Sequence, residues 1–173
     1  MYQMTGDASL NCPPHLMEIV TEWVFSKPSL ALMSAIASPK HSATPIPGLI
    51  HWCVMAPVAR VAADDGSADD SAAAQTLFSR LHLGVLQTML RGQEIGMRHV
   101  ILCEHFEHSL ATLAAIPRDS VDAESLNMSL NRLGQALQVA KTTGLLSGDI
   151  AELVASTAAL PHNRLLDIVL RDS

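Results

Sequence analysis

The stretch DAESLNMSLNRLGQALQVAKTT, Asp122–Thr143, decides the fold. Its leucines recur at alternating steps of four and three residues, which is the period of one face of an α-helix. Asp122 is a favourable N-cap, and Gly144 directly after the stretch suits the residue that ends a helix. The sequence therefore predicts an amphipathic helix with one side buried in the core; its apolar residues are Leu126, Leu130, Leu133, Leu137 and Ala140.

The rest of the chain shows the same helical period between breaks at proline, glycine and small polar residues. No segment alternates strictly between apolar and polar residues, so no strand is predicted. The fold class is all-α: stacked antiparallel helices in a helical bundle or a short α-solenoid. Further helices are predicted at Pro13–Lys27, Leu30–Ala37, Gly48–Ala63, Ser71–Arg91, Met97–Ile116, Ser147–Ala159 and from Asn163 onward.

These helices divide into two groups within one predicted domain of 173 residues. Residues 1–63 hold about three helices, and residues 71–173 hold about five. Between them, residues 64–70 form a small, acidic stretch that is typical of a flexible linker. Pro57 interrupts the third predicted helix, where a kink or an end is expected. Gly92 is the expected terminator of the helix that follows the linker.

The first predicted helix has one apolar stripe that is expected to face the core. The stripe comprises Leu16, Ile19, Val20, Trp23 and Val24. Glu18, Thr21 and Glu22 fall outside it. Since apolar residues make up 49% of the chain and charged residues only 16%, more apolar surface is available than one core needs. Such a composition favours a protein that keeps some apolar surface for partners.

Charge and hydropathy exclude several classes of partner. The net charge is −6 and the basic residues are scattered, whereas binding to nucleic acid requires clustered lysine and arginine. No apolar run is long enough to span a membrane. The sequence also lacks the glycine-rich loop that binds phosphates and the nucleophile motif of hydrolases. We therefore expect no direct contact with nucleic acid, membrane or small molecules, no cofactor and no catalytic residue.

The densest cluster of potential metal ligands is Cys103-Glu-His-Phe-Glu-His108. His105 and His108 are three residues apart and share a helix face, but a closed zinc site needs three or four ligands. We interpret the cluster as a solvated helix face and predict no metal site. His82 and His162 are interpreted as structural residues with local hydrogen bonds.

Four residues are candidates for partner binding. Arg132, Gln135 and Gln138 flank the leucine stripe of the longest predicted helix and are expected to tolerate substitution without loss of the fold. Arg132 is the first choice because arginine is enriched in protein interfaces. Trp52 is expected to pack in the core, with a pocket of a partner as the second interpretation.

Five segments in register resemble the Integrator complex subunit fifteen family, in the C-terminal half of its members. They are Pro13–Phe25, Gly48–Ala59 with its Gly-Leu-Ile-His-Trp-Cys-Val-Met-Ala-Pro run, Leu81–Gln87, Ser129–Ala140 and Leu160–Leu166. The resemblance extends from Cys12 to Leu170. Two features depart from the family: the N-terminal helical half is missing, and the link after Arg60 is acidic where a basic stretch is expected.

The resemblance implies a nuclear, non-catalytic scaffold of the Integrator complex, which processes the 3′ ends of small nuclear RNAs and attenuates transcription by RNA polymerase II. It also implies that the partners are other Integrator subunits, and that the chain links the module of subunits ten, thirteen and fourteen to the rest. The alternative is a free-standing helical adaptor or a chaperone-like protein-binding module, which the composition fits equally well.

Overall fold

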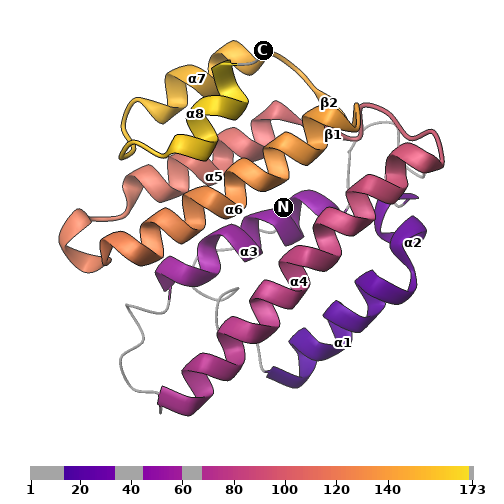
Figure 1. Ribbon diagram of the computed structural model, residues 1–173, viewed down its shortest axis with the longest axis horizontal. Coiled ribbons are helices and arrows are strands. Elements are labelled where there is room, and N and C mark those ends of the chain that lie inside the picture. Colours follow the sequence, from indigo (N-terminus) through magenta and orange to yellow (C-terminus); the bar gives the residue numbers. More distant parts are fainter. Residues whose placement is uncertain (1–13, 34–44, 60–67, 172–173) are drawn as a thin grey trace, which may run out of the picture.

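The computed structural model describes residues 14–33, 45–59 and 68–171 (Figure 1). These residues form eight α-helices, one 3-10 turn and a two-stranded parallel pairing, so the all-α prediction is confirmed. In chain order the elements are α1 Pro14–Ser26, α2 Pro28–Met33, α3 Pro45–Ala59, α4 Ala68–Glu94, β1 Ile101–Leu102, α5 Cys103–Ala115, η1 Arg118–Ser120, α6 Ala123–Thr142, β2 Leu146–Ser147, α7 Ile150–Thr157 and α8 Arg164–Arg171.

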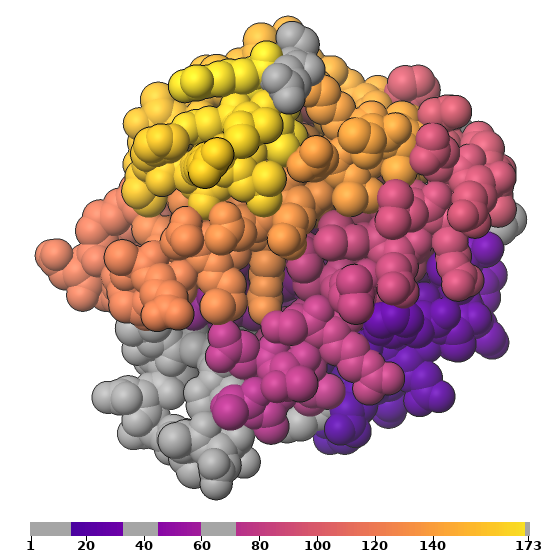
Figure 2. Space-filling model, in the orientation of Figure 1, coloured from indigo at the N-terminus to yellow at the C-terminus, as the bar shows by residue number. Residues whose placement is uncertain are grey.

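The helices stack in successive rows around α6 (Figure 1). Helix α6 packs on α3, α4 and α5, and α8 covers it from the other side. Helix α4 in turn carries α1 and α2, while α7 lies on α5. One continuous cluster of buried apolar side chains is shared by helices from before and after the predicted linker. The C-terminal helices and α1 therefore lie at opposite sides of the molecule, as the space-filling view shows (Figure 2).

Helix α6 is formed as the sequence predicts. The side chain of Asp122 accepts a hydrogen bond from the Ser125 amide at 2.7 Å, which satisfies one of the unpaired donors of the first turn. The helix is followed by Gly144 with φ +71°, a left-handed conformation that favours glycine. All five residues of its predicted stripe are buried, and Leu133 is completely buried.

Helix α1 turns a different face inward from the one predicted. Met17, Thr21 and Val24 are buried against the rest of the protein, whereas Leu16 is 45% exposed and Ile19 is 60% exposed. Thr21 can be buried because its hydroxyl donates to the carbonyl of Met17 at 2.7 Å, so no polar group is left unpaired. The prediction that the whole apolar stripe faces the core is wrong for these two exposed residues.

The segment after α4 corrects four further expectations, among them the prediction that the chain forms no strand. Helix α4 continues through Gly92 to Glu94, so Gly92 does not end it. A Cβ atom at this position would lie 3.0 Å from a methyl carbon of Leu32 and 3.3 Å from one of Leu145, so these side chains would have to shift slightly. The chain then extends, and Ile101 pairs with Leu146 in the parallel strands β1 and β2. The fifth predicted helix therefore begins at Cys103 instead of Met97, and the helix after Gly144 begins at Ile150 instead of Ser147.

The boundaries of α3 and α4 also differ from the prediction. Helix α3 begins at Pro45, three residues earlier than predicted, and ends at Ala59, two residues after Pro57. Ala68–Asp70 of the predicted linker belong to α4, so the prediction of a linker is wrong for these three residues. The remaining part of the linker, residues 64–67, and residues 34–37 of the second predicted helix lie outside the described residues.

Candidate partner-binding surface

Arg132, the first candidate for partner binding, is a buried structural residue. It is 6% exposed; its guanidinium donates to the carbonyl oxygen of Cys53 at 2.8 Å and to the hydroxyl of Ser79 at 3.0 Å. Cys53 lies four residues before Pro57, whose nitrogen carries no hydrogen, so this carbonyl cannot accept the usual helix hydrogen bond from residue 57. The expectation that Arg132 can be substituted without effect on the fold is therefore wrong.

Burial around this contact also perturbs the two ionisable groups. The pKa of Arg132 lies below its ordinary value because the guanidinium is removed from water. Burial raises the pKa of the Cys53 thiol to about 12, an effect that the nearby arginine only partly opposes. The thiol stays protonated at neutral pH, which makes it a poor nucleophile.

The other candidates on α6 are exposed. The side-chain oxygen Oε1 of Gln135 accepts a hydrogen bond from the ring nitrogen Nε2 of His82 at 3.0 Å. Burial lowers the pKa of His82, so the neutral ring is favoured. Gln138 is exposed one turn further on. Both glutamines remain candidates for partner binding.

Trp52 is half-buried and packs edge-on against Phe78, with ring centroids 5.3 Å apart. It contacts both buried apolar clusters, in agreement with its predicted packing role. Its indole nitrogen Nε1 is buried and forms no hydrogen bond within the described part of the chain. Trp52 therefore packs against the core, and its role as an anchor in a partner's pocket remains a prediction.

The histidines of the predicted solvated cluster make local contacts. His105 accepts a hydrogen bond from the Leu102 amide at 3.1 Å, while the ring of His108 lies 4.9 Å from the ring of His51 on α3. Nδ1 of His51 is 3.0 Å from the hydroxyl of Ser109. Among residues 14–33, 45–59 and 68–171, no three histidine, cysteine, aspartate or glutamate side chains are arranged to hold a metal ion.

A pocket opens between the start of α6 and the loop that precedes α8. Its volume is about 600 Å³, within the range of ligand pockets. We call it the α6–α8 pocket. Seven of its ten lining residues are aliphatic: Val121, Ala123, Leu126, Leu130, Ala159, Leu160 and Pro161. The polar lining residues are Arg118, Asn127 and His162. The pocket is therefore an apolar hollow with a few polar groups.

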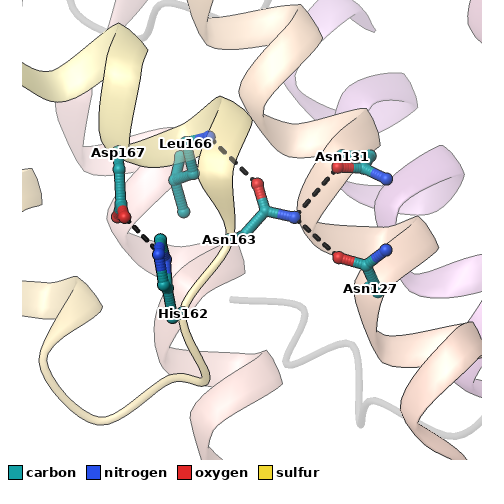
Figure 3. A network of polar contacts seen from close by, with 6 residues as sticks. All are labelled: Asn127, Asn131, His162, Asn163, Leu166 and Asp167. Carbon is teal, nitrogen blue, oxygen red and sulfur yellow. Dashed lines mark hydrogen bonds and ion pairs between the residues drawn. The ribbon is translucent and has the colours of Figure 1, made fainter.

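The wall of this pocket is fixed by a network centred on Asn163 (Figure 3). The amide nitrogen of Asn163 donates to Asn127 at 2.8 Å and to Asn131 at 2.9 Å, both on α6. Its side-chain oxygen accepts from the Leu166 amide at 3.0 Å, which confirms Asn163 as the N-cap of α8. Since the loop is tied to α6 from a buried side chain, the pocket is formed before any partner arrives.

His162 adds a second tie within the same loop. Its Nδ1 lies 2.7 Å from a carboxylate oxygen of Asp167, one turn into α8 (Figure 3). This local contact confirms the structural interpretation of His162. The Asp167 carboxylate on α8 is therefore engaged by His162.

Aliphatic side chains are exposed on the opposite side of the molecule. Leu16 and Ile19 project from α1, and Leu83 and Leu90 from α4, all between 45% and 60% exposed. We call Leu16 and Ile19 the α1 face. The same sequence period that predicted burial for the α1 face left its exposure undetected. The excess of apolar residues in the composition indicated that some apolar surface is exposed, but it did not indicate which residues.

Comparison with known proteins gives the same family along the whole chain. The family model of Integrator complex subunit 15 matches residues 1–162. The chain belongs to the Integrator complex subunit 15 family. It is 32% identical over 195 residues to Integrator complex subunit 15 of Danio rerio, with 98% of the chain and 41% of that relative covered.

Two further relatives of the same name agree. The identity is 32% over 206 residues for Mus musculus, covering 98% of the chain and 45% of the relative. It is 25% over 179 residues for Drosophila melanogaster, covering 94% of the chain and 44% of the relative. The chain thus spans less than half the length of the curated relatives it matches. The Arg132–Cys53 contact and the Asn163 loop join segments that carried the resemblance in the sequence.

Proposed function

We propose that the chain is a non-catalytic scaffold of the nuclear Integrator complex, which joins the module of subunits ten, thirteen and fourteen to the remaining subunits. Membership of the family makes other Integrator subunits the expected partners. The observation that carries the scaffold role is the presence of two separate apolar surfaces among the described residues, the α1 face and the α6–α8 pocket. Helix α1 and the C-terminal helices lie at opposite sides of the molecule (Figure 2). A linking subunit needs two such surfaces so that it can hold two partners at once.

The burial of the potentially reactive cysteine and histidine side chains supports a non-catalytic role. The Cys53 thiol is buried with a raised pKa, and His51 and His105 have lowered pKa values because both are partly removed from water. Each of these groups is engaged in the packing of helices. In the described part of the chain, no helix is long and apolar enough to cross a bilayer.

The roles in 3′-end processing of small nuclear RNA and in attenuation of transcription follow, in this proposal, from the assembly that the scaffold holds together. A free-standing adaptor would expose similar apolar surface. The family match favours the Integrator assignment over that alternative.

Affinity purification of the tagged chain from nuclei, read by mass spectrometry, tests the proposal. We expect recovery of subunits ten, thirteen and fourteen together with the remaining subunits. Ile19→Glu places a charge on the α1 face and should remove one group of partners while the other group is retained. Ala111→Glu, at an exposed position of α5, is the matched control. Recovery of no Integrator subunit with the parent chain would reject the proposal.

A further inference from the structure

The α6–α8 pocket has a chemistry that specifies its occupant. Its floor is apolar: Leu126 and Leu130 are buried, and Val121 and Leu160 are half-buried at its sides. Apolar side chains of a partner would therefore gain by leaving water here. The volume of about 600 Å³ accommodates a few aliphatic side chains of a peptide segment.

The polar groups at the rim of the pocket are mainly donors. Arg118 donates one N–H to the carbonyl of Ala159 at 2.7 Å, and its remaining guanidinium N–H groups form no ion pair within the described residues. Asn127 uses its oxygen to accept from Asn163, which leaves its NH₂ group as the available donor. A group with several acceptors satisfies such a rim, and a carboxylate also neutralises the guanidinium.

None of the ten lining residues that the structure describes carries a carboxylate. Asp122, beside it, is engaged as the cap of α6, and Asp167 pairs with His162. Arg118 carries the permanent charge among the ten lining residues, and that charge is positive. Charge complementarity selects an acidic partner over a basic one.

We infer that the α6–α8 pocket binds a protein segment that places aliphatic side chains on the Leu126–Leu130 floor and a carboxylate on Arg118. This inference names the chemistry of one of the two partners and rests on the proposed scaffold function. The Asn163 network holds the loop in place beforehand, so binding does not require the loop to become ordered. The α1 face is assigned to a different partner.

Selection of short random peptides displayed on phage tests the inference without any assumption about Integrator. The parent chain is immobilised, and bound phage are depleted on the Ala159→Glu variant. Ala159 is exposed, so the new carboxylate leaves packing unchanged while it competes for Arg118. We expect enriched peptides to combine leucine, isoleucine or valine with aspartate or glutamate. Enrichment of basic or purely polar peptides, or no enrichment at all, would overturn the inference.

Charge reversal then locates the carboxylate. Binding of an enriched peptide, measured by fluorescence polarisation, should weaken at least about fivefold in Arg118→Glu and change little in Arg118→Lys. The same peptide with its acidic residue replaced by lysine should recover binding to Arg118→Glu. Arg164→Glu, at an exposed position outside the pocket, is the control. Equal binding to the Arg118 and Arg164 variants would overturn the assignment of Arg118.

Two further outcomes keep the inference separate from the proposed function. If peptides from this chain itself bind the pocket more tightly than the selected acidic peptides, the occupant is a second copy and the inference fails. If Ala159→Glu co-purifies with the same Integrator subunits as the parent chain, the scaffold function stands while the pocket inference fails. Circular dichroism of each variant confirms that its helices are intact before binding is compared.

Discussion

The guanidinium of Arg132 takes the place of a backbone N–H for the carbonyl oxygen of Cys53. Pro57 removes the amide that would have paired with this carbonyl in α3, and Arg132 reaches across from α6 to donate at 2.8 Å. An unpaired buried carbonyl destabilises a fold by about 1–3 kcal/mol, so the contact lets a proline remain inside a buried helix. It also fixes the position of α3 against α6.

The first prediction concerns the hydrogen bond from Arg132 to the carbonyl oxygen of Cys53. Arg132→Ala should lower the free energy of unfolding by about 2–4 kcal/mol, because it unpairs the Cys53 carbonyl and leaves a void. Adding Pro57→Ala returns the missing N–H, so the loss caused by Arg132→Ala should be smaller in the Pro57→Ala background. Urea unfolding of the four proteins in this double-mutant cycle measures the coupling. Additive effects would show that Arg132 does not replace the helix donor.

The same contact shows why the sequence could not reveal the role of Arg132. Arginine is rarely buried, and its position beside the leucine stripe of α6 suggested a surface residue. A proline within a predicted helix does indicate an unpaired carbonyl four residues earlier. The sequence does not say which residue supplies the donor, because the partner comes from a helix 79 residues away.

Local signals explain the predictions that are confirmed. The leucines of α6, the Asp122 cap and Gly144 act within one or two turns of the helix, where periodicity and capping preferences operate. Long-range packing decided the rest. The rotation of α1 and the pairing of Ile101 with Leu146 depend on neighbours that are distant in sequence. The α6–α8 pocket is likewise assembled from separate segments.

The second prediction tests the core of α6. Leu133 is completely buried, and Leu133→Ala should lower the free energy of unfolding by about 2–5 kcal/mol. Gln138 is exposed on the same helix, so Gln138→Ala should change it by less than about 0.5 kcal/mol. Urea unfolding with circular dichroism compares the two variants. An unchanged midpoint for Leu133→Ala would mean that this helix side is not part of the core.

The third prediction addresses the loop that shapes the pocket. Asn163→Ala removes the cap of α8 and both ties to α6, and we expect a loss of about 1–3 kcal/mol. Asn163→Ser keeps a capping oxygen but loses the reach to Asn127 and Asn131, so it should restore only part of the stability. Hydrogen exchange of the Leu166 amide separates the two effects: its protection should fall in Asn163→Ala and be retained in Asn163→Ser. Equal stability of both variants and the parent would contradict a structural role for the network.

The last prediction concerns pH. Burial is the largest cause that lowers the pKa of His51, His82 and His105 below their ordinary value of 6.5. The neighbouring His108 also lowers the pKa of His51 and His105, and Arg132 lowers that of His82. The unfolded chain therefore binds more protons than the folded chain between the lowered values and about 6.5, so the free energy of unfolding rises with pH in that window. This stability is fully present above pH 6.5 and is lost as the pH falls through the lowered values. Urea unfolding between pH 7.5 and pH 5.5 should show the decline. His51→Gln should make this decline shallower, because it removes one of the three groups with a lowered pKa. A pH-independent free energy of unfolding across this range would contradict the lowered pKa values.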